Sequence, residues 1–353
     1  MLNTVLNTLG LGRPRTPPPP MLDGPWAPND ALETAAPVAA MPGMDCVVAD
    51  RAGNLHVSSQ TTIHRLSKDG EPVAWATFDA AVTAMAAGPS GIVAAIEGVG
   101  LVRLDEAGNT VARLDLASRC VTAIAVDPRD EVYFAIGSAT CPAGEWYRDL
   151  MDKGAGGSLH KWAGPGGAVR IAGDLAFPAG LAFDAGGGLL VSEAWRHRIL
   201  RLRPSGGAPE VLAANLPGYP GRISAMRDGY LLSVFAMRTL LVDFVLTEDA
   251  FRTEMIETID PEYWIRPSLY SGTSYLEPLQ GGAIVKLGVK KAWSPPRSYG
   301  LVVALDANGV PTASWHSRVG GRFHGVTSAI ERGDDLFVVS KGADTLLRLE
   351  KTI

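Results

Sequence analysis

Three polar side chains have the types and positions that acid–base chemistry needs: Asp45, Arg222 and His324. Each lies beside the start of an expected strand, in MDCVVAD, GRISAM and FHGVTSAI. Histidine exchanges protons near neutral pH, so His324 is a candidate catalytic acid or base. The alternative for His324 is a turn histidine bonded to a neighbouring carbonyl. Asp45 and Arg222 are a candidate catalytic carboxylate and anion clamp, or an ion pair that closes a channel.

Other motifs that carry chemistry are missing from the sequence. Cys46, Cys120 and Cys141 are far apart and show no CxxC spacing, so neither a disulfide framework nor a zinc site is indicated. The serine elbow GxSxG does not occur. The glycine clusters GAGG and GGG do not open a helix after a strand, so they are expected to be turns and not phosphate loops.

Composition limits the class of protein. The chain has 353 residues, of which 46% are apolar and 20% are charged, and its net charge is −5. A core of that extent and mixed charges are typical of a soluble globular protein, and no basic stripe suggests a nucleic-acid partner. The N-terminus has too short an apolar run for a membrane span and lacks the pattern of a signal peptide. We therefore expect a cytoplasmic protein whose partner is a small-molecule substrate. Its oligomeric state is left open.

The elements that position the candidate residues follow from a repeat. An apolar stretch, a Gly-, Asp- or Pro-rich turn and a β-rich strand recur six times, starting at Cys46, Ala84, Ala123, Gly180, Ser224 and Ser328. Further apolar strands follow most copies, so the unit is four antiparallel strands in about 40 residues, the size of a propeller blade. The pattern predicts an all-β, six-bladed β-propeller, with a β-sandwich array or two small β domains as alternatives. Residues 32–40 are expected to close the ring by pairing with the C-terminal LLRLE.

Two kinds of segment depart from the repeat. Residues 1–30, which contain four consecutive prolines, are expected to be a disordered or extended arm before a propeller spanning 31–353. Insertions are expected at about 141–157 and, in blade five, at about 246–300. The second is rich in aromatic residues, including Tyr263, Trp264, Tyr270, Tyr275 and Trp293. We expect it to form a lid in which Tyr263 and Trp264 bind substrate, or else an edge cover or an oligomer contact.

A propeller of this kind collects the starts of its inner strands at the mouth of the central channel. The expected residues there are Asp45, Thr83, Thr122, Ala179, Arg222, His324 and Thr327. Among these, Thr122 and Thr327 are candidate substrate-binding residues.

The order of several longer motifs resembles a known family. The stretches EWYRDLMDKGAGGSLHKW, FPAGLAFDAGGGLLVSEAWRHRILRL, LPGYPGRISAMRDGYLLSV, RSYGLVVALDANG and HGVTSAIERGDDLFVVS occur in this order. They resemble the strictosidine synthase-like family, over about residues 40–350. That family belongs to the six-bladed superfamily of gluconolactonases, senescence marker protein and paraoxonases. Glu193, Trp195 and His197 resemble a family signature. Glu193 and Trp195 are therefore candidate substrate-binding residues, and the alternative is that the signature residues orient the blade.

The resemblance also indicates which metal ligands and catalytic residues of the related enzymes are missing from this chain. Lactonases of the superfamily hold calcium, and the motifs place their ligands at Asp45, Thr122, Ala179, Gly221 and Arg222. Only Asp45 is a charged oxygen ligand, whereas calcium takes six to eight oxygens and Arg222 would repel it. We therefore expect no metal and no cofactor. The condensing strictosidine synthases use a glutamate in blade six, and that position here is Thr327.

Three functions are consistent with the sequence. The first is metal-independent hydrolysis of a small ester or lactone in the central channel, with Asp45, His324 and Arg222 as its polar groups. The second is a propeller that binds a small molecule without catalysis. The third is a Pictet–Spengler-type condensing enzyme with a relocated base.

Overall fold

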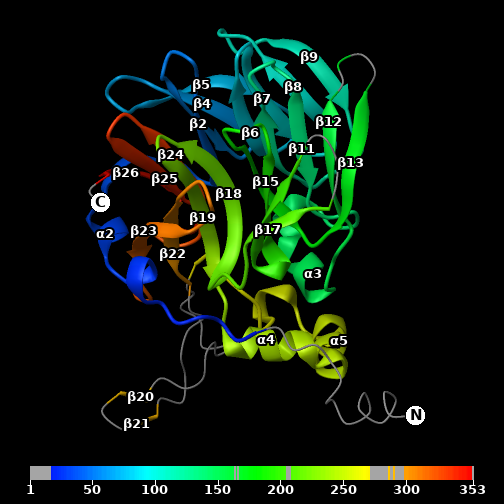
Figure 1. The fold of residues 1–353 in the computed structure, drawn as a ribbon, viewed down its shortest axis with the longest axis vertical. Coiled ribbons are helices and arrows are strands. Elements are labelled where there is room, and N and C mark those ends of the chain that lie inside the picture. Colours follow the sequence, from blue (N-terminus) through cyan, green and yellow to red (C-terminus); the bar gives the residue numbers. More distant parts are fainter. Residues whose placement is uncertain are drawn as a thin grey trace.

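Six four-stranded antiparallel sheets form the body of the protein. The computed structural model describes residues 17–162, 164, 167–203, 208–270, 285–286, 289–290 and 298–351. The sheets are the blades of a six-bladed β-propeller, as the repeat predicted (Figure 1).

The first three blades follow one another along the chain, each numbered from its inner strand outward. Blade one is β2 (Met44–Ala49), β3 (Leu55–Ser59), β4 (Thr62–Leu66) and β5 (Pro72–Thr77). Blade two is β6 (Val82–Gly88), β7 (Gly91–Ile96), β8 (Gly100–Leu104) and β9 (Thr110–Asp115). Blade three is β10 (Val121–Val126), β11 (Val132–Ile136), β12 (Gly157–Trp162) and β13 (Ala168–Leu175).

The last three blades complete the ring. Blade four is β14 (Pro178–Phe183), β15 (Leu189–Glu193), β16 (Arg198–Leu202) and β17 (Glu210–Ala213), with the 3-10 turn η4 (Ala194–Arg196) after β15. Blade five is β18 (Gly218–Met226), β19 (Gly229–Met237), β22 (Gly300–Leu305) and β23 (Pro311–Ser317). Blade six is β24 (Val326–Arg332), β25 (Asp335–Ser340), β26 (Thr345–Glu350) and β1 (Ala36–Ala40), with the turn η6 (Lys341–Ala343) after β25.

The two ends of the chain close the ring inside blade six. Strand β1 pairs antiparallel with β26, Ala36 lying opposite Arg348 and Ala40 opposite Thr345. This is the predicted closure, and it gives β26 a partner on each side, because β26 also pairs with β25. An edge that would otherwise be open to another chain is covered.

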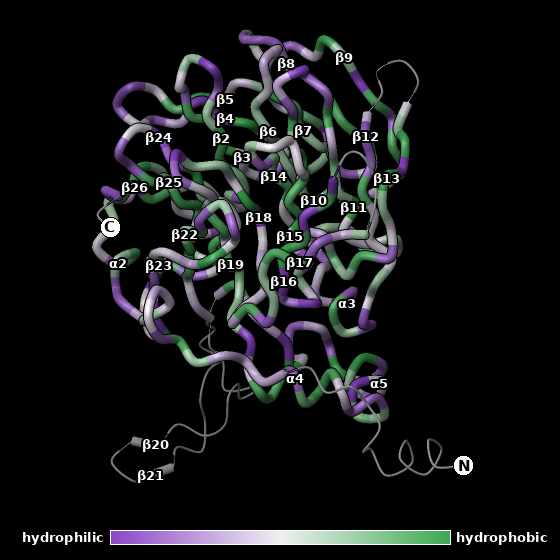
Figure 2. Tube along the Cα trace, in the orientation of Figure 1, coloured by the Kyte–Doolittle hydropathy of each residue, from purple (hydrophilic) through white to green (hydrophobic). Residues whose placement is uncertain are grey.

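Apolar side chains fill the spaces between neighbouring blades. Among the described residues, separate buried clusters lie at each of the six blade junctions. Leu101 and Phe134, for example, meet between blades two and three. Figure 2 shows the same division, with hydrophobic stretches along the strands and hydrophilic stretches at many turns. A four-stranded sheet buries both faces only when its neighbours are present, so the closed ring is the stable unit.

Two insertions gather at one end of the propeller (Figure 1). Between β11 and β12 lie η2 (Ala143–Glu145) and α3 (Trp146–Met151). Between β19 and β22 lie α4 (Leu240–Thr247), α5 (Asp249–Thr258), η5 (Pro261–Tyr263), β20 (Val285–Lys286) and β21 (Val289–Lys290). Side chains of both insertions share one buried cluster that includes Leu150, Val242, Met255 and Trp264. We call this pair of packed segments the cap. Tyr275 and Trp293 lie outside the described residues.

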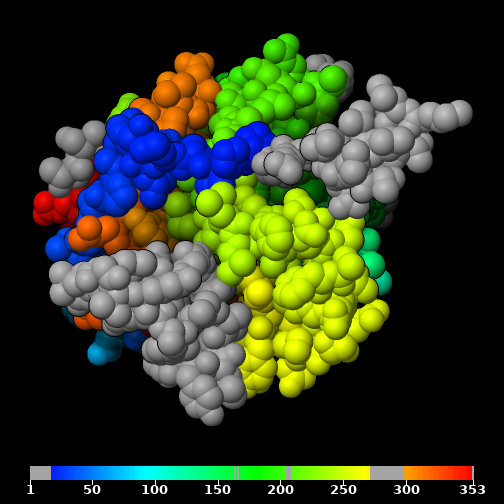
Figure 3. Space-filling model, turned by 90° about the horizontal axis from the view of Figure 1, so that it is seen from below, coloured from blue at the N-terminus to red at the C-terminus, as the bar shows by residue number. Residues whose placement is uncertain are grey.

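The described part of the N-terminal arm is extended and bonded to the propeller. It contains the short turn η1 (Gly24–Trp26) and the one-turn helix α2 (Ala31–Thr34). Figure 3 shows it, in blue, crossing one face of the molecule next to blade five. Asn29 donates its amide to the Ser314 carbonyl at 2.9 Å and accepts the His316 backbone N–H at 3.0 Å. The arm thus covers the outer edge of β23. No helix in the described part of the chain is long and apolar enough to cross a membrane.

Candidate functional site

Each inner strand carries a β-bulge near its start, and the bulges define one ring of side chains. The pairing register between the first and second strand shifts there by one residue in five blades, and in blade five two opposite shifts flank Pro220. A bulge redirects the side chain at the extra position. The side chains at the six bulges all line one cavity, and they are Asp45, Thr83, Thr122, Ala179, Arg222 and Thr327. Six of the seven residues expected at the channel mouth are therefore brought together.

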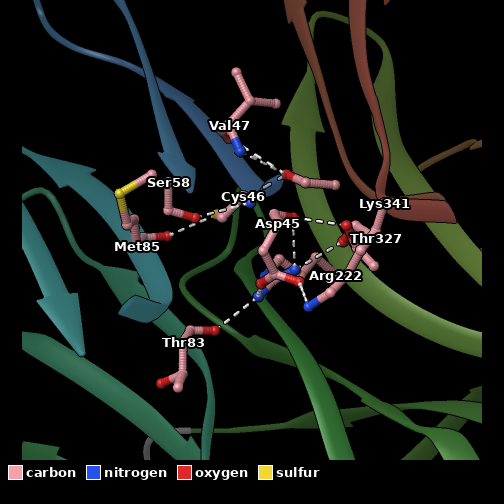
Figure 4. A network of polar contacts seen from close by, with 10 residues as sticks. Asp45, Cys46, Val47, Ser58, Thr83, Met85, Arg222, Thr327 and Lys341 are labelled. Carbon is pink, nitrogen blue, oxygen red and sulfur yellow. Dashed lines mark hydrogen bonds and ion pairs between the residues drawn. The ribbon is translucent and has the colours of Figure 1, made fainter. Parts of the chain in front are cut away.

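Arg222 bonds to three other blades from its place in this ring (Figure 4). Its Nη1 donates to the carbonyls of Asp45 at 3.1 Å and Thr327 at 3.0 Å. Its Nη2 donates to the Thr83 carbonyl at 2.8 Å and to Oδ2 of Asp45. These bonds use all four Nη–H groups, so Arg222 keeps only Nε–H without an acceptor among the described residues.

Asp45 is held between two cations. Its Oδ2 accepts from Arg222, and its Oδ1 accepts from Lys341 Nζ at 2.6 Å. Burial works to raise the pKa of Asp45, but the charges of Arg222 and Lys341 outweigh burial and hold the pKa at about 2. The carboxylate is therefore ionised at neutral pH and is a weak base.

Lys341 is the cation of the site with donors to spare. An ammonium group has three N–H donors, and Asp45 is the one acceptor that Lys341 Nζ contacts among the described residues. Its side chain is 36% exposed, compared with 17% for Arg222. Lys341, and not Arg222, is therefore the group that can meet an anion in the cavity.

The cavity has a volume of about 320 Å³, within the range of small-molecule sites. Its apolar wall includes Trp146 from α3, Phe177 from the residue before β14, and Phe235 from β19. Behind Arg222 lies a much narrower cavity of about 40 Å³. Arg222 lines both cavities and therefore lies between them.

His324 does not belong to this cavity, which corrects its expected place. The side chain is buried, with Nδ1 bonded to Ser298 Oγ at 2.5 Å and Nε2 bonded to the Arg318 carbonyl at 3.0 Å. Burial lowers its pKa, so the ring is neutral at pH 7. The reason is position: His324 lies two residues before β24, outside the bulge. The alternative of a turn histidine bonded to a carbonyl describes this geometry.

Glu193 and Trp195 also lie outside the cavity lining. Glu193 is fully buried and accepts from the Ala176 backbone N–H at 2.7 Å and from Arg196 and Arg198, each at 2.5 Å. Trp195 stacks on Phe177 with ring centroids 4.4 Å apart and donates Nε1–H to a buried carboxylate. Both residues orient blade four and support the wall of the cavity from behind.

The lid residues have a different place from the one expected. Trp264 is 2% exposed and donates Nε1–H to the Ile259 carbonyl at 2.7 Å, so it packs inside the cap. Tyr263 is half-buried at the end of η5 and does not line the cavity. In the described part of the blade-five insertion, Leu269 is the residue that reaches the cavity. The blade-three insertion contributes more, through Ala143, Gly144 and Trp146.

Sequence reasoning missed a second ring of lining residues, among them Lys341. Gln60, Glu97 and Lys341 each follow directly after the second strand of a blade, and all three line the cavity. The repeat contained this signal, because LHVSS, GIVAAI and LFVVS are equivalent strands. Reading one residue past each strand would have found Lys341.

Comparisons with known proteins give the fold and not the family. No family model matches the chain, and no curated protein is similar to it in sequence. Similar solved structures include regucalcin, a calcium-binding protein from Agrobacterium tumefaciens, with 13% identity over 89% of this chain and 93% of that one (TM-score 0.57). A gluconolactonase from Xanthomonas campestris has 15% identity over 89% and 88% (TM-score 0.55). A luciferin-regenerating enzyme has 12% identity over 90% and 92% (TM-score 0.54).

The fold is that of the gluconolactonase and regucalcin propellers. These neighbours share the six-bladed ring with the present chain at identities too low to carry an activity across. The narrower resemblance to the strictosidine synthase-like family rests on motif order alone.

The calcium that regucalcin binds does not fit the residues at this channel mouth. Ala179 and Gly221 have no side-chain oxygen, and the Arg222 guanidinium is bonded to Asp45, the one carboxylate among the expected ligand positions. Within the described ranges, no group of three or more His, Cys, Asp or Glu side chains lies together in a way that could hold a metal ion. The arrangement supplies an ammonium donor, a carboxylate acceptor and an aromatic wall, which together suit an uncharged carbonyl compound that becomes an anion as it reacts.

Proposed function

We propose that the protein is a hydrolase of small esters or lactones that works at the channel mouth without a metal. The main observation behind this proposal is that Lys341 and Asp45 line the same cavity. Lys341 Nζ uses one N–H donor on Asp45 and keeps the other two. An oxyanion formed from a bound carbonyl would find a positioned donor there. The gluconolactonase among the structural neighbours makes hydrolysis of a cyclic ester a reasonable reaction for this scaffold.

The roles follow from the contacts. Asp45 accepts a hydrogen bond from a water, takes its proton as the water oxygen bonds to the carbonyl carbon of the substrate, and holds that proton until the leaving oxygen accepts it. The new C–O bond puts negative charge on the carbonyl oxygen, and Lys341 stabilises that charge. When the bond to the leaving oxygen breaks, the proton of the water passes to that oxygen. Arg222 is a positioning residue that fixes Asp45 and blocks the channel beneath it.

A second function is favoured by one observation. Both oxygens of Asp45 are bonded to cations and its pKa is held at about 2, which makes it a weak acceptor of a proton. A protein that binds the same kind of molecule without turning it over would show this geometry. A condensing enzyme is not favoured in this way, since the blade-six position is Thr327 and its hydroxyl donates to the Asp45 carbonyl at 2.7 Å.

The proposal is tested with the full chain after exhaustive dialysis against EDTA. The substrates are aryl esters, alkyl esters of aromatic acids, aromatic lactones and glucono-lactone, and the enzymes are the wild type, Asp45→Asn and Lys161→Gln. Lys161 pairs with Glu131 on blade three and does not line the cavity, so its variant is the matched control. We expect turnover by the dialysed wild type and the control, and at least a tenfold loss in Asp45→Asn. Absence of turnover with every substrate would refute the proposal, and ligand binding without turnover would establish the second function.

A further inference from the structure

We propose that the substrates carry an aromatic acyl group, so that the product bound in the cavity is a small aromatic carboxylate. This inference rests on the proposed hydrolysis, and it names the substrate class of the same site. Hydrolysis of such an ester consumes one water and yields an aryl carboxylate, an alcohol and a proton. The carboxylate then occupies the place of the reaction's oxyanion beside Lys341.

The aromatic wall of the cavity suits a flat, apolar ligand. Trp146 and Phe235 meet edge to face, with ring centroids 5.3 Å apart and ring planes inclined at 68°. Phe177 lines the same cavity, and Trp195 is stacked behind it. Aromatic rings prefer such offset and edge contacts with one another, so a ligand ring gains more from this wall than an alkyl chain does.

Phe177 also holds a backbone conformation that few bulky residues adopt. Its φ is +56°, in the left-handed region, and the next residue is Pro178, which further restricts it. Such strained residues are concentrated at functional sites. The strained turn places the Phe177 ring against Trp195 and at the cavity wall, which supports a binding role for this aromatic group.

The charges at the cavity leave one positive charge unbalanced. Arg222 and Lys341 face the single carboxylate of Asp45. Glu97 at the rim is already paired with Arg119 at 2.8 Å, so it does not neutralise the second cation. A ligand with a single negative charge therefore completes the balance, whereas a neutral or cationic product does not.

Apart from Thr83, whose Oγ1 has no partner among the described residues, the hydroxyl groups of the lining are already bonded to the protein and offer little to a molecule with many hydroxyls. Thr122 donates its hydroxyl to the Pro178 carbonyl at 2.5 Å, and Thr327 donates to the Asp45 carbonyl at 2.7 Å. All four Nη–H donors of Arg222 are bonded to groups of the protein. A sugar acid would bury several hydroxyls beside apolar side chains with too few partners for all of them, and an unpaired buried hydroxyl is unfavourable. Sugar lactones are therefore expected to be poor substrates.

The test measures binding by isothermal titration calorimetry on the full chain with three probes. 2-Naphthoate has the ring and the charge, 2-naphthamide has the ring alone, and gluconate has a carboxylate with hydroxyl groups in place of the ring. The proteins are the wild type, Lys341→Gln, Trp146→Ala and the control Lys161→Gln. Melting curves recorded beside the titrations show that each variant is folded.

The wild type and Lys161→Gln should bind 2-naphthoate roughly tenfold or more tightly than 2-naphthamide, because hydrogen bonds to a charged group contribute about 1.5–3 kcal/mol. Gluconate should not bind measurably. Lys341→Gln should bind 2-naphthoate as weakly as 2-naphthamide, and Trp146→Ala should weaken both aromatic probes. Equal binding of the two aromatic probes by the wild type, gluconate binding as tight as that of 2-naphthoate, or an unchanged 2-naphthoate affinity in Lys341→Gln would overturn the inference.

The two proposals can fail separately. Ester turnover without selective 2-naphthoate binding would remove the substrate class and leave the hydrolase. Selective 2-naphthoate binding through Lys341 without turnover of any ester would support the ligand class and remove the hydrolase.

Discussion

At the scale of single residues, Arg222 and Lys341 differ in how their N–H donors are used. Both are cations next to Asp45, yet Arg222 uses its Nη–H groups to join strands of blades one, two and six to its own blade five. Lys341 makes one such bond and keeps the rest of its donors for the cavity. From the sequence, Arg222 was the expected anion clamp. Its hydrogen bonds fit the alternative of an ion pair that closes the channel, and in our proposal Lys341 is the anion clamp.

The low pKa of Asp45 predicts how the stability of the protein depends on pH. This pKa is about 2 in the folded protein against the ordinary value of 3.8 in an unfolded chain, so the folded state binds fewer protons than the unfolded state between these values. The stabilisation is complete above about pH 4 and is lost as the pH falls through about 2, and it amounts to about 2 kcal/mol. Urea unfolding of the wild type between pH 5 and 2 should show this loss.

Asp45→Asn is the matching variant. It should be less stable than the wild type by about 3 kcal/mol at pH 7, because Arg222 and Lys341 are left facing each other without a counter-charge. The difference between the two proteins should shrink as the pH falls toward 2. Asp69→Asn, at an exposed carboxyl between β4 and β5, is the control. A constant difference from pH 7 to 2 would contradict the role given to Asp45.

At the scale of elements, the cap is a packed unit in which Trp264 has a structural role. Arg266 lies over the Tyr147 ring at 4.3 Å and Arg148 lies over the Trp264 ring at 5.4 Å, so the two insertions hold each other. Lys153 and Asp249 add an ion pair between them at 2.5 Å. The cap positions Trp146, and through it the aromatic wall.

Trp264→Ala should therefore act mainly on stability. Removing a large side chain that is 2% exposed should cost roughly 3–5 kcal/mol, measured by thermal unfolding. Trp146→Ala, at a half-buried position on the cavity wall, should cost much less stability and more ligand affinity. The opposite ranking of the two variants, with Trp264→Ala affecting affinity alone, would restore Trp264 as a ligand contact.

The inner strands were predictable because their spacing repeats, and the bulges were not. Asp45, Thr83, Thr122 and Thr327 could be placed at the channel mouth from their positions at strand starts. His324 could not be placed, because its position two residues before β24 gives no sign of which way the chain turns. The cap was beyond prediction for another reason. Packing between two insertions that are about 100 residues apart leaves no period in the sequence.

At the scale of the whole molecule, the ring is closed by a few residues at the two ends of the propeller. Deleting residues 347–353 removes most of β26, including Leu347, which is fully buried, and Leu349, which is 9% exposed. The deletion also breaks ladders with both β25 and β1. We expect a loss of at least about 5 kcal/mol in the free energy of unfolding, or no cooperative unfolding at all.

Deleting residues 1–25 is the comparison for that experiment. It leaves all six sheets intact and removes bonds such as the one from Arg238 Nη2 to the Pro17 carbonyl at 2.6 Å. This truncation should lower the melting temperature by much less than the C-terminal one. If the two truncations were equally damaging, the closure at β1 and β26 would not be the main restraint on the ring.

The stability of the whole propeller is expected not to depend on calcium. A ligand that binds only the folded state must raise the melting temperature, so millimolar calcium added to the EDTA-dialysed protein should leave that temperature unchanged. Differential scanning calorimetry is the measurement. A rise of several degrees would mean that other groups bind an ion and that the misfit at Ala179, Gly221 and Arg222 is compensated.

The central claim is that Lys341 stabilises the oxyanion of an ester that is hydrolysed at the channel mouth without a metal. It is tested most directly by kcat/KM for methyl 2-naphthoate, measured in EDTA for the wild type, Lys341→Gln and Lys161→Gln. The account predicts turnover by the wild type and Lys161→Gln, and a loss of roughly 100- to 1,000-fold in Lys341→Gln, the usual effect of removing one oxyanion donor. Equal kcat/KM in Lys341→Gln and the wild type, or no hydrolysis by the wild type, would contradict it.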